Sequence, residues 1–183
     1  HPAWLDALHE IRKLKDEGLV GAIGVTNFDA AHLALALADG IPIASNQVSF
    51  SVVDRRARGE LSALCAQSGV KLLAYGTLNG GFLSEKWLGQ PEPTDIHDWS
   101  KSKYKRFIDA AGGWRVYQDL LTTLGRIARV HGVSLPNVAT RWVLEQPAVA
   151  AIIIGARIGE NVHHENNRHV FDFTLTRDDH AAL

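Results

Sequence analysis

The alternation of short apolar runs with helical segments limits the fold of this chain more than any other feature. Runs rich in Val, Ile, Leu and Ala predict strands at residues 20–28, 41–50, 70–75 and 148–155. Between these runs, apolar residues recur at the spacing of helices that pack on a sheet. Strands and helices that alternate in this way form parallel β/α units, so we expect an α/β fold.

Capping and stop residues locate the helices between the strands. We expect helices at residues 2–18, 29–38, 54–69, 114–131, 134–147 and 160–170, and one that begins at Thr176. Asp29, Asp54 and Ser134 are the expected N-terminal residues of three of them. Residues 76–113 contain turn residues and aromatic residues but no clear period, so we expect a long loop there, and such loops are usually functional.

Two architectures fit this pattern, a doubly wound open sheet and a (β/α)₈ barrel. No G-x-G-x-x-G follows a strand and no G-x-x-x-x-G-K-[ST] occurs, which disfavours the nucleotide-binding open sheets. A whole barrel needs about 250 residues, whereas this chain has 183 and four β/α units. The chain starts at His1, contains no methionine and ends two turns into a helix. We therefore expect a single domain over residues 1–183, a half-barrel truncated at both ends.

Composition excludes several classes of protein. With 46% hydrophobic residues, 21% charged residues and a net charge of −1, the chain resembles an ordinary globular protein. It has no basic excess for nucleic acid or an anionic membrane, and no apolar run of about 18 residues. No signal-peptide pattern is present, so we expect a cytoplasmic protein. Cys65 has no partner for an internal disulfide, and a buried thiol is the expected state.

The stretch VKLLAYGTLNGG, residues 70–81, is the most unusual part of the sequence. Its apolar run does not alternate, which predicts a strand buried on both faces. Tyr75 then stands at the carboxyl end of the strand, where parallel α/β folds bind ligands. Gly76, Gly80 and Gly81 let the following backbone turn sharply and approach another group closely.

Polar side chains follow the other strands at the equivalent position. In a barrel these positions converge on one mouth. Amide and hydroxyl groups beside an aromatic ring suit a flat ligand that carries a carboxamide, and Arg157, just before a helix, suits a phosphate. The residues concerned are Thr26, Asn27, Ser45, Asn46, Gln47, Tyr75, Gly155 and Arg157.

Each of these residues also has a purely structural interpretation. Asn27 could cap the second helix, and Asn46 and Gln47 could serve as hydrogen-bonding groups of a buried strand. Tyr75 could belong to the core or to the rim of the sheet. In the long loop, three tryptophans could line a pocket or anchor the loop; they are Trp87, Trp99 and Trp114.

The histidines near the C-terminus resemble a metal cluster only superficially. His163, His164, Glu165 and His169 lie close in sequence, but His164 and His169 do not have the i, i+4 spacing of a helical metal site. H-E-x-x-H is absent. We therefore expect a solvated helix face and no metal.

Five stretches in order along the chain resemble successive landmarks of the aldo-keto reductases. They are GAIGVTNF, SNQVSFSVVDRR, VKLLAYGTLNGGFLSEKW, VATRWVLEQPAVAAIIIGAR and NVHHENNRHVFDF. The resemblance implies a (β/α)₈ barrel of which this chain covers about the last four units. It also implies an oxidoreductase that reduces aldehydes or ketones, or oxidises alcohols, with NADP(H) more than NAD(H), and that acts on small molecules.

The resemblance also assigns cofactor-binding roles, residue by residue. Asn27 and Gln47 would bind the nicotinamide carboxamide, with Thr26 beside them, and Tyr75 would stack on the ring. The pyrophosphate would lie on Gly76, Thr77, Leu78 and Gly80. Gly155 and Arg157 follow the last strand, with Arg157 placed for the 2′-phosphate. Asn166 and Asn167 would hold the adenine, although Asn166 replaces the usual acid and His163 stands where arginine is common.

The catalytic residues of this family lie upstream of residue 1. The resemblance implies that a tyrosine, a lysine, an aspartate and a histidine perform the proton transfer, and none of them matches a position here. Tyr104 and Tyr117 have no Lys and Asp beside them in the required pattern, and we expect Tyr104 on a lid or solvated rim rather than in contact with the substrate. We therefore expect no catalytic residue in this chain and no activity from it alone. The alternative hypothesis is a non-catalytic half-barrel that self-associates through its open sheet edges and at most binds nucleotide.

Overall fold

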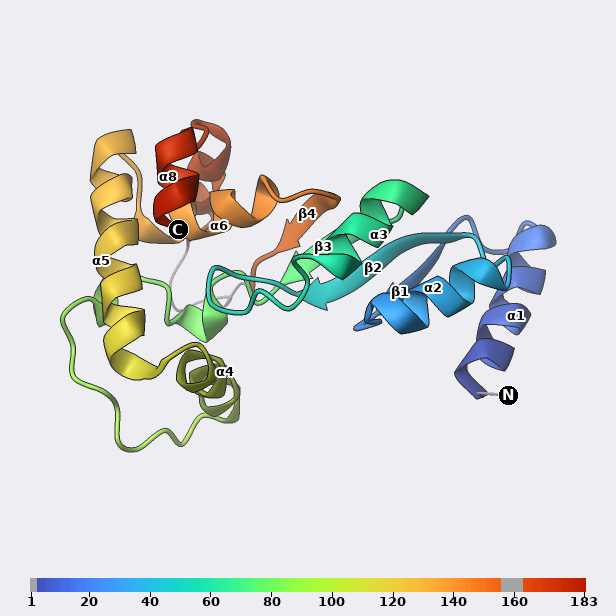
Figure 1. Cartoon of the computed structure of the whole chain (residues 1–183), viewed down its shortest axis with the longest axis horizontal. Helices are drawn as coiled ribbons and strands as arrows, with labels where there is room; N and C mark the ends of the chain where they lie inside the picture. Colours follow the sequence, from blue (N-terminus) through green and yellow to red (C-terminus); the bar gives the residue numbers. More distant parts are fainter. Residues whose placement is uncertain (1–2, 156–162) are drawn as a thin grey trace.

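The computed structural model describes residues 3–155 and 163–183, in which strands and helices alternate (Figure 1). The strands are β1 (Ile23–Thr26), β2 (Ile43–Ser49), β3 (Lys71–Tyr75) and β4 (Val149–Ile153). The α-helices are α1 (Ala3–Asp16), α2 (Ala30–Ala38), α3 (Glu60–Ser68), α4 (Trp99–Ala110), α5 (Gly113–His131), α6 (Leu135–Leu144), α7 (His164–Arg168) and α8 (Arg177–Ala182). Three 3₁₀ turns are η1 (Asn79–Gly81), η2 (Glu85–Trp87) and η3 (His169–Phe171).

The four strands form one parallel sheet in the order β1-β2-β3-β4. Each strand is therefore the neighbour of the next strand in sequence. A doubly wound sheet reverses its direction of growth at a switch point, whereas a barrel adds strands in sequence order. The strand order therefore favours half a barrel over a doubly wound sheet.

Residues on the two faces of the sheet differ in burial. One face contains Ile23, Val25, Val48, Leu72 and Ala74, all buried beneath helices. The residues between them point to the opposite face and are half-buried or exposed; they include Thr26, Gln47, Leu73, Tyr75 and Ile153. The expectation that β3 is buried on both faces is thus wrong for this chain, because its helices cover only one face.

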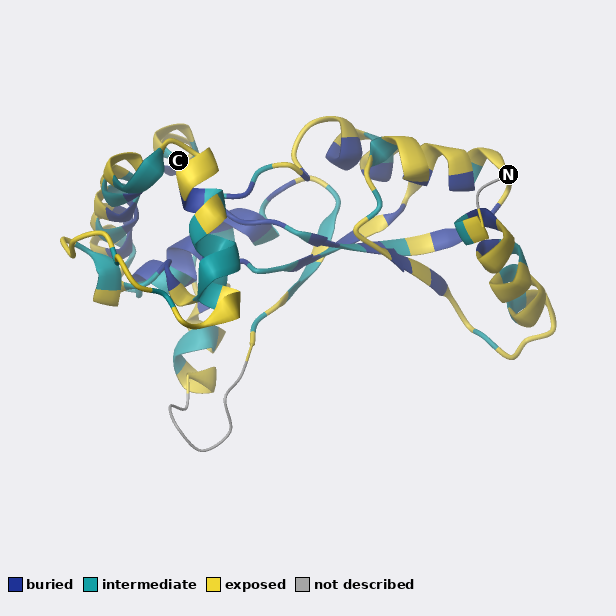
Figure 2. Ribbon diagram, turned by 90° about the horizontal axis from the view of Figure 1, so that it is seen from below, coloured by how far each residue is buried: buried dark blue, intermediate teal, exposed yellow. Residues whose placement is uncertain are grey.

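Packing is densest around the helices that follow β3. α5 and α6 bury apolar side chains along most of their length, including Leu121, Leu124 and Trp142, whereas α1 buries only Leu5 and Leu8. Figure 2 shows the same difference, with exposed residues dominating the helices near the N-terminus. Cys65 on α3 is fully buried, and this burial raises the pKa of its thiol to about 11. Among the described helices, none is both long and apolar enough to cross a membrane.

Two sequence expectations about the elements are wrong. The loop expected at residues 76–113 contains the 12-residue helix α4, whose N-cap Asp98 accepts a hydrogen bond from the Lys101 backbone N–H. Asp54 does not begin a helix, because α3 begins at Glu60 after Gly59. Asp54 instead closes a turn in which the Ser51 hydroxyl accepts a hydrogen bond from the Asp54 backbone N–H. The strands are also shorter than expected, as β1 shows.

Candidate functional site

The carboxyl ends of β1, β2 and β3 bring four of the predicted site residues together. Thr26 and Gln47 are paired across β1 and β2, and the Asn27 N–H donates to the Gln47 backbone oxygen at 2.9 Å. The Tyr75 hydroxyl at the end of β3 donates to Asn27 Oδ1 at 2.8 Å. The Tyr75 ring and the Asn27 carboxamide therefore meet at one edge of the sheet, beside the backbone of Gln47.

Two asparagines at this edge have different roles. Asn46 is fully buried, and its side chain donates to the Phe28 carbonyl at 2.8 Å and accepts from the Phe28 N–H at 3.3 Å. These bonds fix the turn after β1, in which Asn27 has a φ of 59°. Asn27 does not cap α2, whose N-cap is Asp29. Asn46 thus has the structural role, and Asn27 is left at the surface of the edge.

The glycine loop, residues 76–81, leaves β3 in a tight left-handed path. Gly76, Asn79, Gly80 and Gly81 all have positive φ, between 48° and 86°. Thr77 and Asn79 are buried, and neither Thr77 Oγ1 nor Asn79 Oδ1 has a hydrogen-bond partner among the described residues. Leu78 precedes the turn η1. The loop therefore contains buried polar atoms whose hydrogen-bonding capacity is unused.

The close approach that the glycines permit is made by a side chain of α4. A Cβ added at Gly76 would lie 2.8 Å from the Tyr104 hydroxyl oxygen, and one added at Gly80 would overlap the Tyr104 ring. Asn79 Nδ2 also donates to the Tyr104 carbonyl at 3.3 Å. The neighbouring Lys103 places its Nζ 5.8 Å from the centroid of the Tyr75 ring. Helix α4 therefore lies over both the ring and the loop.

An ion pair between the buried Asp54 and the exposed Arg56 lies beside this helix. Arg56 donates to both carboxylate oxygens of Asp54, at 2.8 and 2.7 Å, and its guanidinium lies 4.9 Å from the Phe107 ring of α4. Burial would raise the pKa of Asp54, but hydrogen bonds from Arg56 and Ser49 outweigh it and hold the pKa below its ordinary value. Burial raises the pKa of Tyr104, and the neighbouring Tyr75 and Asp54 add to this rise.

The site residues expected after β4 are only partly described. Gly155 is exposed just beyond β4. Arg157 lies outside the described residues. His163 is exposed before α7, and Asn166 on α7 donates to the Ser134 hydroxyl at the start of α6, at 3.0 Å. Asn167 is half-buried on the same helix.

The histidines of α7 and η3 are paired with neighbouring carboxylates. His164 Nε2 lies 3.2 Å from Glu165 Oε1, and His169 Nδ1 lies 2.7 Å from Asp172 Oδ2. In residues 3–155 and 163–183, no three or more His, Cys, Asp or Glu side chains are grouped as metal ligands.

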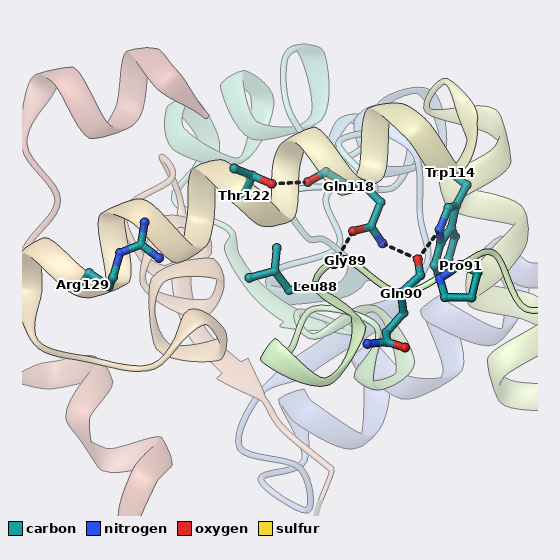
Figure 3. A pocket seen from close by; sticks show the side chains of 8 residues that line it. All are labelled: Leu88, Gly89, Gln90, Pro91, Trp114, Gln118, Thr122 and Arg129. Atoms are coloured by element: carbon teal, nitrogen blue, oxygen red, sulfur yellow. Dashed lines mark hydrogen bonds between the residues drawn. The ribbon is translucent and has the colours of Figure 1, made fainter.

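A groove lies along α5 (Figure 3). Gln118 accepts from the Gly89 N–H at 2.8 Å and donates to the Trp87 carbonyl at 2.9 Å. Trp114 donates to the Gln90 carbonyl at 2.9 Å and packs edge-on against Trp87. These contacts anchor residues 87–90 to α5. The groove contains none of the predicted site residues.

Two other aromatic residues, Trp99 on α4 and Tyr117 on α5, differ in exposure. Trp99 is 78% exposed at the start of α4. Tyr117 is buried and donates to the Phe82 carbonyl, and its burial raises the pKa of its hydroxyl. Neither Tyr104 nor Tyr117 therefore has the lowered pKa of a tyrosine prepared to donate a proton.

The sequence interpretation missed the contribution of α4 to this site. Tyr104 was expected on a lid or rim, and Lys103 was given no role. A weak signal was present, because Asp98 is a good N-cap and the few apolar residues Tyr104, Phe107 and Ile108 have the i, i+3, i+4 spacing of a helix. What the sequence could not show is that the partner of the glycines is Tyr104.

Comparison with known proteins gives one family. The model described as the aldo/keto reductase family matches residues 2–183. "Flagellar radial spoke protein 5" of Chlamydomonas reinhardtii is 38% identical over 130 residues, which cover 69% of this chain and 24% of that protein. The "NADH-specific methylglyoxal reductase" of Escherichia coli (strain K12) is 27% identical over 182 residues, 94% of this chain and 52% of that protein.

Comparison with a solved structure gives the fold. An aldo/keto reductase from Klebsiella pneumoniae in complex with NADP and acetate superposes with a TM-score of 0.67 and 23% identity, over 97% of this chain and 52% of the other. The chain thus spans about half, or less, of the proteins it matches. The expected barrel-type α/β fold is confirmed, with four of its strands present.

Proposed function

Because the chain belongs to the aldo/keto reductase family, we propose that it carries most of the nicotinamide nucleotide site of an oxidoreductase. The reaction is reduction of an aldehyde or ketone, or the reverse oxidation of an alcohol. One observation carries this proposal, the meeting of Tyr75, Asn27 and Gln47 at the carboxyl edge of the sheet. A planar ring with a carboxamide needs a flat aromatic surface and paired amide groups, and this edge provides both.

Unused polar groups support a nucleotide at this edge. No described side chain makes a hydrogen bond with the Gln47 carboxamide. Gln47 is half-buried on the less covered face of the sheet. Thr77 Oγ1 is unpaired in the glycine loop. Thr77 and the backbone of Gly76 and Leu78 would hold the pyrophosphate, while Asn166 and Asn167 would hold the adenine. When bound, the nucleotide supplies or accepts the hydride.

The chain contributes binding and orientation, and we propose that proton transfer comes from residues upstream. Asn27 and Gln47 would fix the rotation of the carboxamide, and Tyr75 would hold the ring plane. The 183-residue chain alone should be inactive, whereas the full-length protein should reduce 4-nitrobenzaldehyde with NADPH. Reduction by the isolated chain at a rate equal to that of the full-length protein would contradict this division of roles.

The preference for NADP(H) over NAD(H) rests on Arg157. A guanidinium beside a helix start favours a phosphate group, such as the 2′-phosphate of NADPH. Arg157→Ala should therefore weaken NADPH binding much more than NADH binding, as measured by calorimetric titration of both nucleotides. Equal losses for the two nucleotides would remove Arg157 from this role.

A second candidate function follows from the open sheet. Within the described residues, β1 and β4 each have one unpaired edge, and Ile153 on the uncovered face is 43% exposed. Such edges favour pairing with another chain, so the isolated chain would be a self-associating module. Light scattering during size-exclusion chromatography distinguishes the cases, because a monodisperse monomer excludes edge pairing.

We place the active protein in the cytoplasm and expect small carbonyl compounds or alcohols as its substrates, with no nucleic acid and no membrane partner. The choice of substrate would depend on residues 79–113, which lie beside the proposed ring site through α4. A screen of aldehydes and ketones with the full-length protein, followed by NADPH absorbance, tests this substrate class.

A further inference from the structure

Helix α4 presents two consecutive side chains to the two surfaces that the proposed nucleotide would use. Lys103 lies over the ring of Tyr75, and Tyr104 lies on the glycine loop. Ring and loop are the expected contacts of the nicotinamide and the pyrophosphate. The chain therefore places its own side chains on its proposed ligand site.

The contact of Tyr104 with the loop is close. Gly76 and Gly80 have no side chain, and the Tyr104 ring lies where their Cβ atoms would be. The Asn79 side chain adds a hydrogen bond to the Tyr104 carbonyl, so the helix backbone is also held. On this side of the loop, a phosphate group reaches the backbone only if the Tyr104 ring moves.

Lys103 competes for the aromatic surface. Its Nζ lies 5.8 Å from the Tyr75 ring centroid and 5.5 Å from the Tyr104 ring centroid, within the range of cation–π attraction. A nicotinamide ring that stacks on this face of Tyr75 has to replace the ammonium group. In the free protein, the Lys103 ammonium group therefore lies within cation–π distance of both the Tyr75 and the Tyr104 ring.

The two halves of α4 are held differently. The C-terminal half has Ile108 in the core, Phe107 against Arg56, and Lys105 paired with Glu92 and Asp109 at 2.5 Å. The N-terminal turn has Trp99 largely exposed. Apart from the Asn79 hydrogen bond, the half that carries Lys103 has fewer contacts with the core, so we expect displacement of Lys103 and Tyr104 to begin there.

We propose that α4 is a built-in competitor of the nucleotide, in which Lys103 and Tyr104 occupy the site until nucleotide displaces them. This proposal rests on the proposed nucleotide site. A site that is open only part of the time binds with an affinity reduced by its open fraction, so removing the competitor raises apparent affinity and association rate.

The first test measures NADPH association with the full-length protein by stopped-flow fluorescence. Tyr104→Ala and Lys103→Ala should each speed association severalfold, whereas Tyr104→Phe keeps the ring and should match the wild type. Lys101→Ala is the control on the same helix, because no described residue bonds its side chain. Lys103→Ala removes only a half-buried side chain, so it tests the proposal even if Tyr104→Ala fails to fold.

The outcomes separate the two proposals. If the wild type binds NADPH and neither Tyr104→Ala nor Lys103→Ala speeds association, the competitor role is overturned and the proposed nucleotide site is retained. Binding by the variants alone would support both. Failure of every protein to bind would overturn both.

Limited proteolysis of the wild type gives a second measurement. Trypsin cleaves after Lys103 and Lys105, so displacement of α4 by NADPH should accelerate cleavage at these positions. Slower cleavage in the presence of NADPH would mean that α4 closes over the nucleotide, which contradicts the proposal.

Discussion

At the residue scale, the edge of the sheet depends on a buried amide that is hydrogen-bonded to the backbone. Asn46 satisfies both backbone groups of Phe28 and is itself fully buried. This keeps the turn that carries Asn27 in place, with Asn27 in a left-handed conformation that asparagine tolerates better than most residues. Asn46 therefore positions Asn27, and the Asn27 side chain accepts a hydrogen bond from the Tyr75 hydroxyl.

We predict that Asn46→Ala lowers the free energy of unfolding by about 1–3 kcal/mol, because it leaves the Phe28 N–H and C=O without their partner. Urea unfolding followed by circular dichroism measures this change. Ser45→Ala, at the neighbouring half-buried position, is the control and should change stability by less than about 0.5 kcal/mol. An equal effect of the two substitutions would contradict the positioning role of Asn46.

Asp54 makes a pH-dependent contribution to stability. Because its pKa is lower in the folded chain than its ordinary value of 3.8, its contribution is complete above that value and is lost as pH falls through the lower folded pKa. The Tm of Asp54→Asn should lie below that of the wild type from pH 7 to pH 5, and the gap should shrink below about pH 4. Arg56→Gln removes the partner and should show the same pattern. A gap that stays constant down to pH 3 would refute this account.

At the scale of elements, the sequence predicted the order of strands and helices and the position of the glycine loop. It did not predict that helix α4 packs on this loop. The strands were recognisable because their apolar runs are short and bounded by turn residues. Helix α4 was missed because its apolar residues are few and lysines separate them, so no strong period results. Contacts such as that between Tyr104 and Gly80 join residues 24 positions apart, and local pattern carries no information on them.

Two glycines of the loop form a matched pair for testing this contact. Gly80 and Gly81 have φ values of 65° and 86°, so alanine strains the backbone at either position. Only at Gly80 would the new Cβ also overlap Tyr104, since nothing lies within 4 Å at Gly81. Gly80→Ala should therefore lower Tm more than Gly81→Ala, and Tyr104→Ala should remove the difference. Equal Tm losses would mean that Tyr104 does not rest on Gly80.

At the scale of the whole molecule, the uncovered sheet face explains which predictions held. The order of strands and helices in the sequence predicted half a barrel, and the five sequence motifs predicted the family. Both predictions are confirmed. Burial of β3 on both faces did not hold, because burial depends on what lies opposite, and only one face of this sheet is covered by described residues. The cofactor-binding roles expected of all the site residues, from Thr26 to Asn167, stay predictions.

The account depends most on the claim that Tyr75 is the surface for a nicotinamide ring. Calorimetric titration of the full-length protein with NADPH, for the wild type, Tyr75→Phe and Tyr75→Ala, tests it directly. We predict saturable binding that Tyr75→Phe largely keeps and that Tyr75→Ala weakens by about 1–3 kcal/mol, the usual range for stacking of a base on an aromatic side chain. Equal affinity of Tyr75→Ala and the wild type, or no binding by either, would contradict the claim.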